Sequence, residues 1–230
     1  TLIEARIPFV IPGKQIYLPF LGTMLTEKCD AETTGIGPDK LRPSAQQLLF
    51  AMILDGCHPM PLAPLAKRFQ VSAMTITRAA DQLCKNDLIK KIGMGSGAQK
   101  MLITEYSPKE LYQKMRPYLI QPVRKTVYID KADVHPEMFP AGLFALSEMS
   151  MLNPPAIQTC GTVRFSLEKG SYAGTLLDTN KQCALQVWKY DPRMISQTKM
   201  VDVLSLALSL AEDEDERTQQ CLEELTERIW

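Results

Sequence analysis

The sequence predicts an α+β protein, with a helical region near the middle of the chain and a mixed α/β region after it. Apolar residues recur at helical spacing over 43–56, and short β-prone runs such as 125–130 lie between turn signals rich in Pro and Gly. The chain has 230 residues, of which 45% are hydrophobic and 23% charged. A chain of this size and composition can bury a core without disulfide or metal support.

We divide the chain into three parts. Residues 1–40 form an extended N-terminal segment that we expect to pack on the rest. Within it, the β-prone runs Ile3–Ile11 and Ile16–Leu25 flank Pro12-Gly13-Lys14, so we expect a hairpin or two extended segments. Residues 41–122 hold four helices and two strands. Residues 123–230 form a mixed α/β C-terminal domain.

The central part has a definite order of elements. We expect helices over 43–56, 62–69, 73–86 and 107–119, and strands over 88–92 and 100–104 joined by a turn at Gly93–Gly97. Pro43 suits the first turn of a helix, and Ser72 is placed to cap the third one. Three helices followed by a hairpin are typical of a winged helix-turn-helix, whose third helix enters the DNA major groove.

The outer face of the third helix carries small, polar and basic side chains that suit DNA. The net charge of the chain is zero, but residues 61–100 hold seven Lys or Arg against two acids, a local balance of +5. Such a basic region attracts phosphates. The residues that we expect to contact double-stranded DNA are Ser72, Ala73, Thr75, Thr77, Arg78, Gln82, Lys91, Ser96 and Lys100.

The stretch from Pro64 to Lys91, PLAKRFQVSAMTITRAADQLCKNDLIKK, resembles the core of the MarR family of transcription factors. The matching positions are Val71, Ser72, Thr75, Thr77, Arg78, Asp81, Leu83, Leu88 and Ile89. The resemblance implies a winged helix that binds duplex DNA and regulates transcription. The family dimerises through long terminal helices, and that dimer does not carry over to this chain. We still expect a homodimer, because two half-sites then bind as one event. This chain departs from the family at Asn86-Asp87, where a glycine is usual, and in a wing that lacks the arginine pair.

The C-terminal part resembles the C-terminal domains of AbiEi-type antitoxin regulators over 141–152, 184–192 and 201–217. This resemblance implies a regulator with a protein partner, so a protein-interaction module is the alternative function. From the residue pattern we expect strands over 125–130, 162–167 and 184–190, and helices over 140–151, 201–210 and 213–230.

A metal-dependent nuclease or nucleotidyl-transfer enzyme is the third possibility. Asp202 and the acids of 212–216 could hold Mg²⁺, but acids at a helix start are also favoured by the helix dipole. His58 and His135 each precede a proline and have no metal-ligand spacing. We therefore expect no catalytic residue, no metal and no cofactor.

Cysteine spacing and hydropathy bear on the cellular location. The six cysteines form no C-x-x-C pair, so we expect reduced, mostly buried thiols in a cytoplasmic protein, with one redox-sensing cysteine as the alternative. No apolar run reaches about 18 residues and no basic leader precedes one, so we expect no membrane partner.

The acidic segment 211–230, with a charge balance of −6, carries an apolar stripe of Leu222, Leu225 and Ile229. Residues spaced by three and four lie on one face of a helix, and such a face must be buried. The stripe therefore either supplies a homodimer contact or closes its own domain.

Overall fold

The computed structural model describes residues 9–11, 15–18, 23–26, 39–93, 100–165, 171–196 and 198–230. The contacts divide the chain into two compact units, residues 1–38 and residues 39–230. The second unit combines helices with two sheets whose strands are mostly antiparallel, so the expected α+β class is confirmed. None of the described helices has the length and apolar character needed to cross a membrane.

The N-terminal unit is an antiparallel meander of β1 (Phe9–Ile11), β2 (Gln15–Leu18) and β3 (Thr23–Thr26). Val10 pairs with Ile16 and Tyr17 with Met24, so the expected hairpin is confirmed and a third strand extends it. The third strand was not expected, because residues 16–25 were predicted to be a single extended segment. Pro19 and Gly22 interrupt that run in the sequence, and both residues disfavour the interior of a strand. Packing of this segment on the rest stays a prediction.

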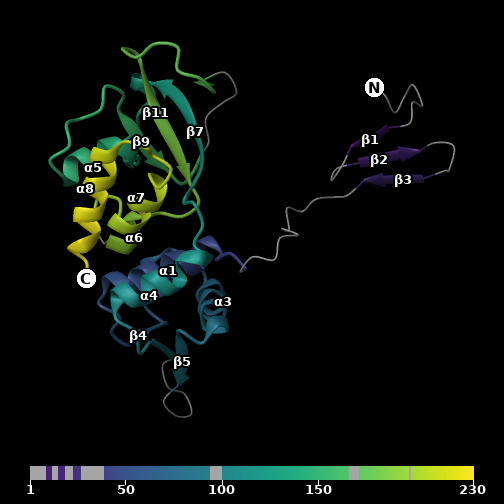
Figure 1. The fold of residues 1–230 in the computed structure, drawn as a ribbon, viewed down its shortest axis with the longest axis vertical. Helices are drawn as coiled ribbons and strands as arrows, with labels where there is room; N and C mark the ends of the chain where they lie inside the picture. The colour runs from purple at the N-terminus through teal and green to yellow at the C-terminus, as the bar shows by residue number, and fades with distance from the viewer. Residues whose placement is uncertain are drawn as a thin grey trace. The chain divides into compact units, whose positions relative to one another are not determined.

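The central part combines helices with a small sheet (Figure 1). Its elements are α1 (Pro43–Leu54), β4 (Met60–Pro61), α2 (Leu65–Arg68), α3 (Ala73–Leu83), the 3-10 turn η2 (Cys84–Asn86), β5 (Lys90–Gly93) and β6 (Lys100–Ile103). The strands form an antiparallel sheet in the order β4-β6-β5. The expected helices and both long strands are confirmed. The two-residue strand β4 was missed, because so short a strand has no periodicity.

Local chemistry sets the ends of these helices. The Ser72 side chain accepts a hydrogen bond from the Thr75 amide at 3.1 Å, so the expected cap of α3 is confirmed. Asp87 ends the turn after α3 with a left-handed φ of 56°, the position where a glycine is usual. Helix α2 is shorter than expected because Pro64, its N-cap, delays its start to Leu65.

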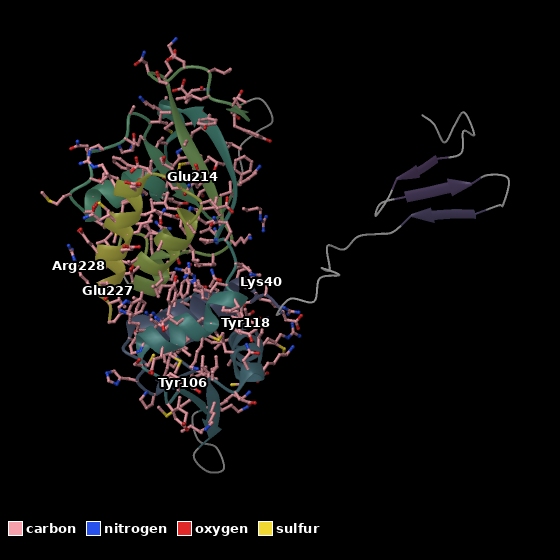
Figure 2. All side chains as sticks on the ribbon, viewed as in Figure 1. Lys40, Tyr106, Tyr118, Glu214, Glu227 and Arg228 are labelled. Carbon is pink, nitrogen blue, oxygen red and sulfur yellow. The ribbon has the colours of Figure 1, made fainter. Side chains whose placement is uncertain are left out.

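Helix α4 (Pro108–Met115) begins with a capping box between Ser107 and Glu110 and passes into the 3-10 turn η3 (Arg116–Tyr118). Pro117 lies in that turn, and the α-helix ends at Met115, earlier than the expected end at residue 119. The Lys40 ammonium donates to the Pro117 and Leu119 carbonyls at 3.0 and 3.2 Å, which holds the start of the unit beside this turn (Figure 2).

The C-terminal part is a five-stranded sheet with helices on one face (Figure 1). Its elements are β7 (Val123–Asp130), the 3-10 turn η4 (Lys131–Asp133), β8 (Phe139–Pro140), α5 (Gly142–Met149), β9 (Thr159–Thr162), β10 (Tyr172–Ala173), β11 (Gln182–Trp188), α6 (Arg193–Ser196), α7 (Val203–Ser209) and α8 (Glu216–Glu227). The strand order is β10-β7-β11-β9-β8, and only the β9–β11 pair is parallel.

One predicted strand is wrong. The prediction placed it over 162–167, but β9 ends at Thr162, residues 163–165 form no strand, and residues 166 and 167 lie outside the described ones. Pairing with β11 selects the earlier segment, with Cys160 opposite Leu185. Gly161 within β9 leaves room for the Phe139 ring. Glycine has a low β-propensity, so the sequence pattern did not predict a strand at this position.

The core runs across the expected boundary at 122/123. Tyr190, Ile195 and Leu204 belong to the same buried cluster as helices α1, α3 and α4. The buried Gln46 amide donates to the Ile120 carbonyl at 2.9 Å and to the Tyr190 hydroxyl at 3.1 Å. Residues 39–230 thus form one compact unit, and a C-terminal part that folds by itself stays a prediction.

The apolar stripe of α8 is buried within its own chain. Leu222 and Leu225 are 5% and 6% exposed and pack in a cluster with Trp188, while Ile229 packs against the central core. Lys109 also pairs with Glu227 at 2.7 Å, which ties α4 to the end of α8. Of the two expected alternatives, the stripe therefore closes its own domain, and a homodimer needs another surface.

Candidate nucleic-acid interface

The hydroxyl groups of α3 are partly engaged by the helix itself. Ser72 and Thr75 share a hydrogen bond of 2.9 Å between their hydroxyls, so this pair has one O–H left to donate to a phosphate. The Thr77 hydroxyl donates to the Ala73 carbonyl at 3.0 Å. Only its acceptor capacity remains, which suits the amino group of cytosine or adenine and not a phosphate.

The outward face of α3 holds the strongest candidate. The Arg78 side chain is exposed, and no hydrogen bond or ion pair engages it among the described residues. Ala73, the first residue of α3, is also exposed, and its small side chain permits close approach. Arginine is the side chain that most often reads guanine, through two parallel hydrogen bonds.

Met74 is a residue of this face that the sequence analysis missed. It is 61% exposed, whereas Ile76, Ala79, Ala80 and Leu83 of the same helix are buried. Its position in the sequence could have identified it, because Met74 does not fall in the three-and-four spacing of the buried residues of this helix. An exposed apolar side chain beside Arg78 can contact a thymine methyl group.

Two predicted DNA contacts have structural partners instead. The Gln82 side chain accepts from the Arg42 amide at 3.0 Å and donates to the Lys40 carbonyl at 3.1 Å, which fastens the start of α1 to α3. The Lys91 ammonium pairs with Asp81, which joins β5 to α3. Neither side chain is free to reach a base or phosphate without breaking these contacts. Ser96 lies outside the described residues.

Fewer basic side chains are free to contact DNA than the composition of residues 61–100 indicates. Arg68 pairs with Asp55 at 3.0 Å and donates to the Met194 and Ile195 carbonyls, so it is part of the framework. Lys90 pairs with Glu105 at 2.8 Å, and Lys91 is engaged as described. Of the seven basic residues of 61–100, the exposed ones without a described partner are Lys67, Arg78, Lys85 and Lys100.

Three of the acids considered as metal ligands lie at helix starts. Asp202 caps α7 by accepting from the Ser205 amide at 2.9 Å, and Asp215 caps α8 by accepting from the Thr218 amide at 2.9 Å. The interpretation of the 212–216 acids as a helix start holds for Asp215 and Glu216, whereas residues 212–214 precede the helix. The described part of the chain contains no group of three His, Cys, Asp or Glu placed to hold a metal ion.

The described cysteines are free thiols. Cys160 and Cys183 are buried, Cys57, Cys84 and Cys221 are half-buried, and Cys29 lies outside the described residues. Burial raises the pKa of Cys57 and of Cys160 to about 11. Since the thiolate is the reactive form, burial makes these two thiols poor redox sensors near neutral pH.

Comparison with protein-family models, with curated proteins and with solved structures finds no match for this chain. The likeness of residues 64–91 to the MarR core therefore rests on the residues of the chain themselves.

Proposed function

We propose that the central part of the chain is a winged helix-turn-helix that binds double-stranded DNA and regulates transcription. The observation that carries this proposal is the element order α1-β4-α2-α3-β5-β6 with the sheet order β4-β6-β5. In such a unit the third helix, capped here by Ser72, is the one that enters the major groove. The wing tip of this chain lies outside the described residues.

The candidate DNA contacts divide into two roles. Arg78 and Met74 are the candidates for base contacts, because both side chains are exposed and Arg78 has no described partner. Lys67, Lys85 and Lys100 are candidates for phosphate contacts, which set affinity and orientation but not sequence preference.

The number of free cations limits the salt dependence. Each neutralised phosphate contributes about −0.9 to the slope of log K against log salt. The three lysines assigned to phosphates therefore give a slope of roughly −3 for one protomer. Because the proposal includes a homodimer, a slope of about twice this size is expected when two protomers bind adjacent half-sites.

The test uses duplexes selected from genomic fragments by the tagged full chain, with binding followed by fluorescence anisotropy. Arg78→Ala should weaken binding by about 1–3 kcal/mol and relax sequence preference at one position. Arg124→Ala is the matched control, because Arg124 is also exposed but lies on β7, outside the central part.

Two results would count against the proposal. If Arg78→Ala leaves affinity and sequence preference unchanged, α3 does not recognise DNA. If the chain binds no duplex and instead co-purifies with one partner protein in a fixed ratio, the protein-interaction alternative is supported.

A further inference from the structure

A cleft of about 780 Å³ lies where the central part meets the C-terminal part of the second unit. Its walls come from the start of α1, the turn between α2 and α3, the residues that follow β9 and the residues that follow β11. Small-molecule sites in proteins have volumes of roughly 300–1,000 Å³. The cleft is therefore large enough for an organic ligand and much larger than a single ion.

Cationic side chains from three separate segments meet in this cleft. Arg42, Arg164 and Lys189 all line it, and no hydrogen bond or ion pair engages their side chains among the described residues. Arg193 also lines it, but Asp191 neutralises it through a bridge of 2.7 Å. Lys189 is half-buried, so its ammonium loses part of its hydration without gaining a protein partner.

The remaining charge matches a particular ligand chemistry. Glu137 is the other acid of the lining, which leaves three unpaired cations against one carboxylate, a balance of +2. A phosphate monoester carries about −1.5 to −2 near pH 7 and presents three acceptor oxygens. Guanidinium groups bind such oxygens in pairs, through charge-assisted hydrogen bonds.

The cleft also has an apolar side. Phe69, Val71, Val163 and Met194 line it together with the cations. We propose that this cleft binds a phosphorylated small molecule, with its phosphate on Arg42, Arg164 and Lys189 and its organic body on the apolar side. A duplex phosphate is the less favoured occupant, because a recessed volume of this size suits a molecule that enters it.

The position of the cleft gives its ligand a route to α3. The turn Phe69–Val71 lines the cleft and leads directly to Ser72, the cap of α3. Gln70 in this turn has a left-handed φ of 53°, a conformation that the surrounding contacts must maintain. A ligand that contacts the turn therefore changes DNA affinity, and DNA changes ligand affinity by the same factor. This coupling rests on the proposed DNA binding, whereas ligand binding itself does not.

Calorimetry on the full chain tests the site in the absence of DNA. The probes are the four nucleoside 5′-monophosphates, with the corresponding nucleosides and inorganic phosphate as controls. We expect at least one monophosphate to bind more tightly than both its nucleoside and inorganic phosphate. Arg164→Ala and Lys189→Ala should each weaken that binding roughly tenfold. Arg124→Ala should not change it, since Arg124 lies outside the cleft.

Three outcomes would overturn the proposal. The cleft is not a phosphate site if no monophosphate binds the wild-type chain at millimolar concentration. It holds no organic body if inorganic phosphate binds as tightly as every monophosphate. It belongs to the DNA surface if Arg164→Ala weakens duplex binding while no monophosphate binds. If the chain binds a monophosphate but no duplex, the phosphate site in the cleft is supported. That result would refute only the proposed DNA binding and the coupling between ligand and DNA.

Discussion

Asp202 makes the stability of this protein depend on pH in a direction opposite to that of most carboxylates. Its side chain is 1% exposed, and one carboxylate oxygen accepts from the Ser205 amide while the other, Oδ2, has no described partner. Burial raises the pKa of Asp202 to about 7, although hydrogen bonds from Ser205 lower it. The nearby Tyr190 hydroxyl is also enclosed, and burial raises its pKa well above the usual range.

The direction of this pH dependence follows from the number of protons that the folded and unfolded chains bind. Between about pH 4 and pH 7 the folded chain holds a proton on Asp202 that the unfolded chain has released. Stability therefore falls as the pH rises through this window and becomes constant above it. A shift from 3.8 to about 7 corresponds to about 4 kcal/mol at the upper end, as an order of magnitude. Asparagine caps helices as well as aspartate does but carries no charge.

We therefore expect Asp202→Asn to raise stability by about 1–2 kcal/mol at pH 5 and by about 3–4 kcal/mol at pH 8, measured by urea unfolding. Asp215→Asn is the matched control, because Asp215 also caps a helix but is exposed, and its hydrogen bonds from Thr218 lower its pKa. That control should not gain stability at pH 8. A difference between Asp202→Asn and wild type that stays constant from pH 5 to pH 8 would refute the reasoning.

Three other substitutions test the packing and the helix cap. Gly161→Ala places a Cβ in overlap with the Phe139 ring, so urea unfolding should show a loss of about 1–3 kcal/mol, and an unchanged midpoint would contradict the close approach. Leu225→Ala should cost about 2–5 kcal/mol and leave the sedimentation coefficient unchanged, because the side chain is buried within its own chain. A change of oligomeric state would instead place it at an interface. Ser72→Ala removes the cap of α3 and should cost about 1 kcal/mol, whereas Ser72→Asp should restore that stability.

The local elements of this chain could be predicted because local chemistry decides them. Pro43 at the start of α1, the Ser72 cap and the end of α4 near Pro117 each depend on residues within a turn or two. Strands β4, β8 and β10 could not be predicted, because two residues have no periodicity and each exists only by pairing with a distant segment. For the same reason, the position of β9 depended on its parallel pairing with β11.

In the candidate site, too, some features could be predicted from local sequence and others depend on contacts between distant segments. The sequence by itself identified α3 and Arg78, since spacing and residue type place a basic side chain outside the buried face of a helix. Only the tertiary structure decided which of the candidate side chains remain free, because Arg68, Lys91 and Gln82 are engaged by partners distant in the sequence or on another element. Only the tertiary structure brought Arg42, Arg164 and Lys189 to one cleft. The physical reason is that a hydrogen bond or ion pair depends on distance in space, and sequence spacing reports that distance only within a helix, a strand or a turn.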